Sequence, residues 1–266
     1  FPSSMIVGMI AAMAASAGLG FLIAIPTLRL REDYLAIATL GLAQVIVLTI
    51  QNLPNLTGGV FGISGIARPF QFYQQPNLTD MAFAVFALLG LLITLLLLER
   101  MSRSPWGRVM RAVREDEDAS TALGKNTFVL KLQGFVIGSG LMGLSGALFA
   151  SFSRVISVPE PFTPALTFLI WVMVVIGGSG NYKGVVLGAF VIAFLFWATP
   201  RIPLWLNLAN LSDKVFFGQY IAIGAVLILL VVFRPTGILP EPARVSRRPR
   251  LAFQRRARRK EADLDP

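Results

Sequence analysis

The sequence predicts an all-α, polytopic membrane protein with about seven transmembrane spans, among which broken or re-entrant helices are allowed. Mean hydropathy is +0.69 over 266 residues, which is far more apolar than a soluble domain of this size. Seven apolar runs are long enough to cross a bilayer. Basic residues gather between and after these runs. Together these observations favour a bundle of membrane helices over a water-soluble fold.

The seven apolar runs are each 17 to 23 residues long, and none contains a charged residue. A helix of about 17 to 25 apolar residues spans the hydrocarbon core of a bilayer. The predicted spans are Ser4–Pro26, Tyr34–Ile50, Met81–Leu98, Leu132–Ser153, Ala165–Tyr182, Gly184–Pro200 and Val215–Phe233. The first run also resembles a secretory signal peptide, but it lacks the basic residues that precede the apolar part of such a peptide.

The distribution of lysine and arginine predicts the orientation of the spans, because cytoplasmic loops carry an excess of both. The segment Glu99–Lys131 contains seven Lys or Arg residues, and the chain from Arg234 onward contains ten. We therefore place both segments in the cytoplasm. Alternation of the spans places Thr27–Asp33 and Lys183 inside as well. The segments predicted outside are the N-terminus, Gln51–Asp80, Arg154–Pro164 and Arg201–Lys214.

Small residues recur four positions apart within the spans, and this spacing lets two helix backbones approach closely. The pairs are Gly134 and Gly138, Ser139 and Gly143, Gly143 and Ala147, and Gly184 and Gly188. Helix packing is the simpler interpretation; the alternative is that some of these glycines allow sliding or line a path. No span contains an acidic residue, which argues against an ion-coupled carrier. Energy for transport would therefore come from elsewhere.

Composition also argues against several chemistries. The chain contains neither cysteine nor histidine, so a disulfide framework, a zinc site and histidine-based hydrolysis are all disfavoured. We expect no catalytic residue, no metal site and no cofactor.

Two further motifs have simple interpretations. The segment Gly177–Gly184 (GGSGNYKG) has glycines spaced almost as in a nucleotide-binding loop, but it lies between two membrane-length runs and lacks the Gly-Lys-Ser/Thr order. We predict a tight cytoplasmic turn. The basic tail, residues 241–266, follows a membrane domain of residues 1–240 and has one aromatic residue, Phe253. Anionic lipid is therefore its expected partner, rather than nucleic acid.

A glycine-rich segment, Pro54–Pro69 (PNLTGGVFGISGIARP), is predicted to lie outside. Glycines allow sharp turns and leave backbone N–H and C=O groups accessible to a polar solute. The candidate residues for a substrate path are Thr57, Gly58, Gly59, Gly62, Ser64 and Gly65. The alternatives are a loop that packs against neighbouring helices and one that docks a partner protein.

Four consecutive acidic residues, Glu115–Asp118, lie in the cytoplasmic stretch REDEDASTALGK (Arg114–Lys125). Placing them in the bilayer would cost several kcal/mol each. We expect one short helix around Arg111–Leu123, ended by Gly124 in a left-handed turn, with its acidic residues at the rim of a groove on a soluble partner. The side chains expected to fill that groove are Val113, Ala119, Ala122 and Leu123. The alternative is a solvated helix that contacts nothing.

Five segments, in this order, resemble the permeases of bacterial ATP-binding-cassette importers of the branched-chain amino-acid (LivM) type. They are LRLREDYLAIATLGLAQVI (Leu28–Ile46), LTGGVFGISGI (Leu56–Ile66), GRVMRAVREDEDASTALGKN (Gly107–Asn126), MVVIGGSGNYKGVVLGA (Met173–Ala189) and VVFRPTGILP (Val231–Pro240). The resemblance covers the chain up to Pro240. The resemblance begins after the N-terminal portion that is usual in the family, and Val60 and Phe61 replace the usual residues of the glycine-rich loop.

The resemblance implies a multi-pass permease subunit of the bacterial inner membrane, with no catalytic site of its own. It implies a second, LivH-type permease, two cytoplasmic ATPase subunits that hydrolyse ATP, and a periplasmic binding protein that delivers Leu, Ile or Val. Permeases for urea or short amides share this architecture, and a non-transporting scaffold subunit is a further alternative. Within the cytoplasmic coupling region, residues 99–131, the implied ATPase-coupling residues are Arg111, Arg114, Glu115, Asp116, Glu117, Ala119, Ala122, Leu123 and Gly124.

The predicted orientation is testable in this cysteine-free chain. We expect Asn77→Cys to react with a membrane-impermeant maleimide on whole cells, because Asn77 is predicted to lie outside. Ser102→Cys should react only after the cells are opened. The reverse pattern of labelling would contradict the predicted topology.

Overall fold

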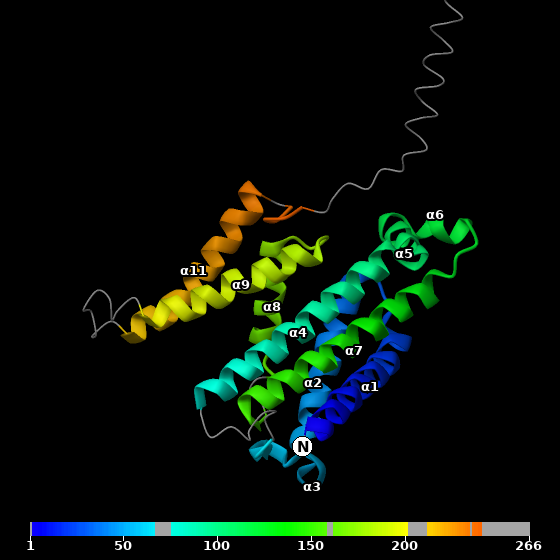
Figure 1. Cartoon of the computed structure of the whole chain (residues 1–266). Coiled ribbons are helices and arrows are strands. Elements are labelled where there is room, and N and C mark those ends of the chain that lie inside the picture. The colour runs from blue at the N-terminus through cyan, green and yellow to red at the C-terminus, as the bar shows by residue number, and fades with distance from the viewer. Residues whose placement is uncertain (1, 67–75, 159–161, 202–211, 235, 241–266) are drawn as a thin grey trace, which may run out of the picture. The chain divides into compact units, whose positions relative to one another are not determined.

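The computed structural model describes residues 2–66, 76–158, 162–201, 212–234 and 236–240 (Figure 1). Helices make up most of the described part, together with two short strands, so the predicted all-α fold class is confirmed. The chain divides into two compact units, residues 1–169 and 170–266, which are described separately. The predicted basic tail, residues 241–266, lies outside the described residues.

Each of the seven predicted spans overlaps a helix. The helices are α1 (Pro2–Thr27), α2 (Glu32–Gln51), α4 (Pro76–Arg103), α7 (Thr127–Ser153), α8 (Pro164–Gly177), α9 (Tyr182–Ala198) and α11 (Ser212–Phe233). Among the described residues, α1, α2, α4 and α7 are long and apolar enough to cross a membrane. Helices α8 and α9 are apolar but have only 14 and 17 residues. The number of seven spans therefore stays a prediction.

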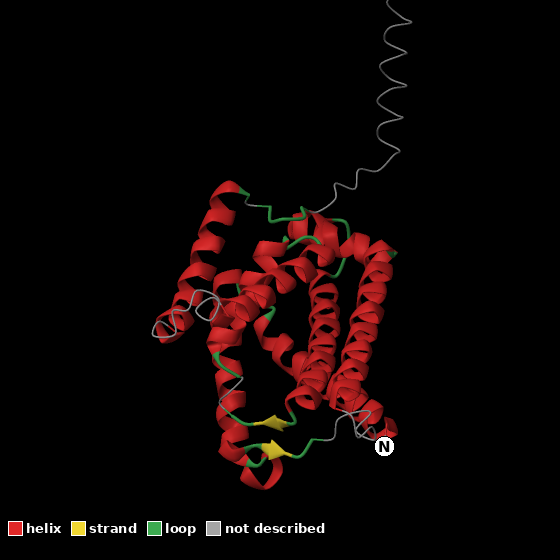
Figure 2. Ribbon diagram, turned by 60° about the vertical axis from the view of Figure 1, so that its left-hand side comes forward, coloured by secondary structure: helices red, strands yellow, loops and turns green. Residues whose placement is uncertain are grey.

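Short elements lie at two opposite ends of the first unit. At one end, α4 is connected to α7 by α5 (Pro105–Glu115) and α6 (Glu117–Ala122). The elements at the other end are α3 (Pro54–Thr57), the 3₁₀-helix η1 (Gly59–Phe61), β1 (Ile63–Ser64) and β2 (Val155–Ile156). Strand β1 follows the α2–α3 segment and pairs antiparallel with β2, which follows α7 (Figure 2).

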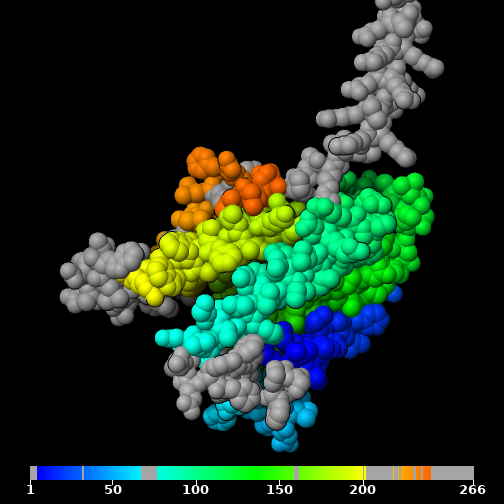
Figure 3. Space-filling model, viewed as in Figure 1, coloured from blue at the N-terminus to red at the C-terminus, as the bar shows by residue number. Residues whose placement is uncertain are grey.

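Helices α1 and α7 pack against each other along their length (Figure 3). The hydroxyl of Ser16 donates a hydrogen bond of 2.6 Å to the carbonyl oxygen of Ser139. A Cβ atom on Gly143 would lie 2.5 Å from the carbonyl oxygen of Ala12, and one on Gly20 would lie 2.5 Å from the Cβ of Ser139. Only residues without a bulky side chain permit this approach. The predicted packing role of Ser139 and Gly143 is therefore confirmed.

The direction of α1 places its C-terminal end beside the first turn of α7. The guanidinium carbon of Arg29, in the α1–α2 connection, lies 5.5 Å from the centre of the Phe128 ring, which is within the range of a cation–π interaction. The α1–α2 connection thus shares an end of the unit with α5 and α6, as the charge distribution predicts. The glycine-rich segment and the start of the Arg154–Pro164 connection share the opposite end through β1 and β2.

In the second unit, α8 ends at Gly177, and the expectation that this span continues to Tyr182 is wrong. Gly178 has a φ of 110°, a conformation that ends the helix and that other residues rarely adopt. A Cβ on Gly184 would lie 2.2 Å from the carbonyl oxygen of Gly177. Asn181 caps α9 by accepting a hydrogen bond from the N–H of Lys183 at 3.1 Å. The predicted tight turn is therefore confirmed.

The segment that follows α11 packs onto this turn. The N–H groups of Ile238 and Leu239 donate to the carbonyl oxygens of Ile176 and Gly177, at 2.9 and 3.1 Å. These bonds satisfy carbonyl groups that a helix end leaves without partners. The glycines of the turn are thus explained by close backbone contact, as the simpler interpretation of the motif predicts.

The α1–α7 contact predicts a position-specific loss of stability. We expect Gly143→Ile to lower the melting temperature of the purified protein in detergent, because the side chain forces the helices apart at a cost of about 1 to 3 kcal/mol. A Cβ on Gly138, in the same helix, meets no atom within 4 Å. Gly138→Ile is therefore the matched control, with a change of no more than about 0.5 kcal/mol. Equal losses at both positions would contradict the observed packing.

Candidate functional site

The corner between α4 and α5 is held by hydrogen bonds of side chains to backbone. The Ser104 hydroxyl accepts a hydrogen bond of 3.3 Å from the N–H of Gly107, which caps α5. Pro105 occupies the first position of α5, where the N–H that it lacks is not needed. The guanidinium of Arg111 donates to the carbonyl oxygen and to the hydroxyl of Ser102, at 3.0 and 3.2 Å. This predicted coupling residue therefore anchors α5 to α4.

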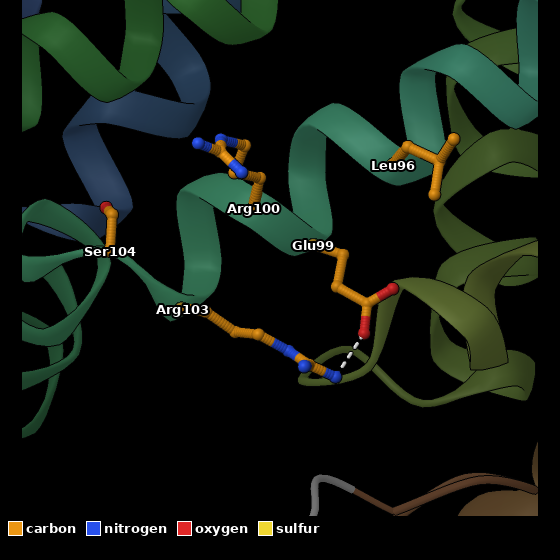
Figure 4. Close-up of a pocket in the computed structure, with 5 residues that line it drawn as sticks. All are labelled: Leu96, Glu99, Arg100, Arg103 and Ser104. Carbon is orange, nitrogen blue, oxygen red and sulfur yellow. Dashed lines mark hydrogen bonds and ion pairs between the residues drawn. The ribbon is translucent and has the colours of Figure 1, made fainter.

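A shallow hollow lies beside this corner (Figure 4). It is lined by Leu96, Glu99, Arg100, Arg103 and Ser104. Arg103 forms an ion pair with Glu99 one helical turn away, and Arg100 points in another direction. Exposed pairs of this kind contribute little to stability. The hollow is thus a basic surface at the end of α4, with one of its two arginines already paired.

The stretch that contains the acidic run forms two helices, so the single helix expected around Arg111–Leu123 is wrong. Asp116 has an extended backbone, with φ of −155° and ψ of 106°, and this interrupts the helix. Its carboxylate then accepts a hydrogen bond of 2.9 Å from the N–H of Ala119, which caps α6. Asp is among the best N-cap residues because its short side chain reaches the free N–H groups of the first turn. One member of the acidic run therefore divides the predicted helix.

A second member of the run, Glu117, forms an ion pair with Lys131 of α7. The hydrogen bond from Lys131 holds the pKa of Glu117 below its usual value. Both side chains are partly exposed. The carboxylate expected at the rim of a partner's groove thus contacts α7 of its own chain.

Helix α5 lies on the first turns of α7. The indole N–H of Trp106 donates a hydrogen bond of 2.9 Å to the side-chain oxygen of Gln133. A Cβ on Gly134 would lie 2.9 Å from the terminal methyl carbon of Met110. Val113 is only 5% exposed. The expectation that Val113 fills a partner's groove is therefore wrong, because the side chain is already buried within this chain.

The outward residues of α6 form a small apolar surface. Ala119, Ala122 and Leu123 are all exposed, and Leu123 is 81% exposed. We call these three residues the α6 edge. Gly124 follows with a φ of 75°, so the expected left-handed turn is confirmed. Arg114 and Glu115 are also exposed.

At the opposite end of the unit, the glycine loop (Pro54–Gly65) turns twice on itself. Gly58 and Gly62 have φ of 74° and 68°, and a Cβ on Gly58 would lie 2.0 Å from the carbonyl oxygen of Gly62. The hydroxyl of Thr57 donates to the carbonyl oxygen of Ile50 at 2.6 Å and accepts from the N–H of Gly59 at 3.2 Å. Thr57 and these glycines therefore shape the loop.

The last residues of the glycine loop pair with β2, the strand that follows α7, and are exposed. Ser64 pairs with Val155 in the two-stranded ladder and is exposed. Gly65 has a φ of 77°, and a Cβ there would meet no atom within 4 Å. Of the six predicted path residues, these two lie open. The exposed tip of the loop carries Val60 and Phe61, which are 57% and 93% exposed.

The structure adds a hollow that the sequence did not indicate. It has a volume of about 620 Å³ and lies between the first turns of α4 and the end of α7. It is lined by Asp80, Phe83, Ala84, Ala87 and Phe152. The two aromatic rings have centres 6.0 Å apart. The one signal in the sequence was Asp80, an acid directly before a charge-free span. The described residues contain no cluster of His, Cys, Asp or Glu suited to a metal ion.

Comparison with known proteins decides the family. A family model described as "Branched-chain amino acid transport system / permease component" matches residues 1–231. The chain belongs to this family. The matched residues include both the glycine loop and the segment from α5 to α6, so both candidate sites lie within the permease fold. Membership of this family and the long apolar helices together identify the chain as a multi-pass membrane protein.

Alignments with two LivM proteins cover most of this chain. It is 33% identical over 252 residues to the high-affinity branched-chain amino acid transport system permease protein LivM of Escherichia coli (strain K12), over 86% of this chain and 55% of that protein. It is 30% identical over 240 residues to the probable branched-chain amino acid transport permease protein LivM of Methanocaldococcus jannaschii, over 88% and 68%.

A second type of relative is more distant. The permease is 28% identical over 204 residues to the high-affinity branched-chain amino acid transport system permease protein LivH of E. coli (strain K12), over 73% of this chain and 60% of that protein. The chain spans about half the length of the E. coli LivM protein. No solved structure matches it.

We predict that the cap at Asp116 protects the amide groups of α6 from hydrogen exchange. We expect Asp116→Ala to speed amide hydrogen exchange in α6, because loss of an N-cap costs about 1 kcal/mol. Asp116→Asn keeps a side-chain oxygen and should exchange like the wild-type protein. Exchange in α7 serves as the internal reference. Unchanged exchange in Asp116→Ala would show that the carboxylate does not cap the helix.

Proposed function

We propose that this chain is the membrane permease subunit of an ATP-driven importer of branched-chain amino acids in the bacterial inner membrane. It would work with a second, LivH-type permease, two cytoplasmic ATPase subunits and a periplasmic binding protein. The names of the relatives support the solute class, because LivM of E. coli and of M. jannaschii are both described as branched-chain amino acid permeases. The permease itself catalyses no reaction.

The observation that carries the proposal is the α6 edge at the basic end of the permease. An ATPase in the cytoplasm can move membrane helices only by holding an element that extends from the membrane. The α6 edge is such an element, since Ala119, Ala122 and Leu123 are exposed while α5 beneath them is hydrogen-bonded to both α4 and α7. Complete burial of a side chain such as Leu123 would contribute about 1.5 to 3 kcal/mol.

The acidic residues have a smaller part in this docking. Glu115 and Asp118 are exposed and lie on either side of the Asp116 cap, where they can meet basic groups at the rim of a groove. Exposed pairs contribute about 0 to 1 kcal/mol each and mainly set orientation. Apolar contact by the α6 edge would therefore supply most of the affinity, and the acids would select the correct ATPase.

The source of energy lies outside this chain. The predicted spans contain no acidic residue that could carry protons across the membrane. The segment Gly177–Gly184 is a helix-to-helix turn covered by Ile238 and Leu239, which is not the open backbone cradle of a phosphate site. We therefore assign ATP hydrolysis to the partner ATPases.

The opposite end of the permease offers groups that suit an amino acid. The hollow between α4 and α7 combines the carboxylate of Asp80 with the rings of Phe83 and Phe152. The apolar wall of the hollow can contact a branched side chain. The exposed residues Ser64 and Gly65 lie at the same end of the unit. A small zwitterion with an apolar side chain fits these groups better than a sugar does.

The test is uptake by the complete complex reconstituted in proteoliposomes. We expect ATP-dependent uptake of leucine and valine, and none of ribose. Ala119→Arg should abolish uptake and ATPase co-purification while the protein stays membrane-inserted, because a charged side chain disrupts the apolar contact. Ala112→Arg, at an exposed alanine of α5, is the matched control and should transport normally.

Two outcomes would contradict this proposal. ATP-dependent uptake of urea or ribose without leucine would reject the solute class. Normal uptake and co-purification with Ala119→Arg would show that the α6 edge is only a solvated surface.

A further inference from the structure

Helix α6 is attached to α7 by a short connection whose backbone groups are bonded. The connection Leu123–Asn126 has four residues. The N–H groups of Gly124 and Lys125 donate to carbonyl oxygens of the last turn of α6, at 2.9 and 3.2 Å. Asn126 caps α7 by accepting a hydrogen bond of 3.1 Å. The connection is thus an ordered joint between α6 and α7.

A second contact between α6 and α7 lies away from this joint. Glu117 lies in the first turn of α6, and Lys131 lies one turn into α7. Their ion pair links positions 14 residues apart. The connection and the ion pair hold α6 to α7 at two separate points. The ion pair and the attachment of α6 to α5 through Asp116 therefore both restrain the angle between α6 and α7.

Beyond the joint, α7 is supported along its membrane-spanning length by α1. The Ser16–Ser139 hydrogen bond and the tight approach at Gly143 connect the two helices at successive turns. A helix packed in this way resists bending, because a bend would open contacts that have almost no free space. A movement applied to the first turn of α7 is therefore transmitted along the α1–α7 pair.

The far end of α7 is attached to the glycine loop. Arg154 ends the helix with a φ of 61°, and its carbonyl oxygen accepts a hydrogen bond of 3.2 Å from the N–H of Ile66. Ile63 pairs with Ile156 in the β1–β2 ladder. A Cβ on Gly62 would lie 1.8 Å from the carbonyl oxygen of Ile156, so the loop lies directly on this segment.

We propose that Glu117 and Lys131 are positioning residues that fix the angle between α6 and α7, so that α7 carries a movement of α6 to the glycine loop. The inference rests on the proposed ATP-driven import. It also changes the role of Glu117 from a contact of the ATPase to a brace inside the permease. Without the brace, α6 still docks but turns about Leu123–Asn126, and its movement does not reach the outer end of the permease.

The first experiment reverses the charges in the reconstituted complex. We expect Glu117→Lys and Lys131→Glu each to lower uptake per ATP hydrolysed by about fivefold, the effect of roughly 1 kcal/mol from a partly exposed pair. The ATPase should still co-purify with both variants. The double reversal restores the pair and should recover coupling to within about twofold of the wild type. Lys125→Glu is the matched control, because the structure describes no ion pair for this exposed lysine.

The second experiment follows the position of α6 relative to α7 in the purified full chain. It needs no transport assay. Spin labels at Ala122→Cys and Ile137→Cys report the distance between α6 and α7, and the chain has no other cysteine. We expect a narrow distance distribution with the native pair, a broader one in Glu117→Lys or Lys131→Glu, and a narrow one again in the double reversal.

The outcomes separate this inference from the proposed function. Absence of ATP-dependent uptake by the wild-type complex would reject the proposed function, while the spin-label result would still test the brace. Normal coupling in both single reversals, or no recovery in the double reversal, would overturn the brace. Loss of ATPase co-purification in Glu117→Lys alone would also overturn it, because Glu117 would then be a docking contact.

Discussion

The close contact between α1 and α7 is the constraint on which the rest of the first unit depends. Ser16 and Ser139 share a hydrogen bond, and the backbone at Gly143 leaves no space for a side chain. In a bilayer the hydrophobic effect does not drive helices together, so packing of small residues and hydrogen bonds between helices hold such a pair. Because α7 is fixed in this way, its two ends give α5, α6 and the glycine loop a common support.

This arrangement explains how two sites at opposite ends of a permease can belong to one function. Trp106 and Met110 place α5 on the start of α7, and the β1–β2 ladder places the glycine loop on its end. Neither site therefore needs direct contact with the other. A rigid helix between them can carry a displacement from one site to the other, provided that each site is firmly attached to it. Coupling between distant sites requires such a physical connection with more than one arrangement.

Much of this organisation could be predicted from local sequence patterns. The charge-free runs identify the membrane helices, and the four-residue spacing of Ser139 and Gly143 identifies a packing surface. The αL conformation of Gly124 follows from its place just after the end of a helix. The acidic run was harder to interpret, because four adjacent carboxylates look equivalent in sequence. In the structure Asp116 caps a helix and Glu117 binds Lys131, so their surroundings differ.

The sequence by itself determined the membrane-helical fold class, the approximate positions of the long apolar helices, the family and the surface location of the acidic stretch. These depend on hydropathy, charge and local backbone preference, which act over a few residues or one span. Only the tertiary structure decided that Val113 is buried, that Glu117 faces α7, and that Asp80 and Phe152 border one hollow. Each of these facts joins elements far apart in the chain, and helix packing, which no local pattern encodes, brings them together.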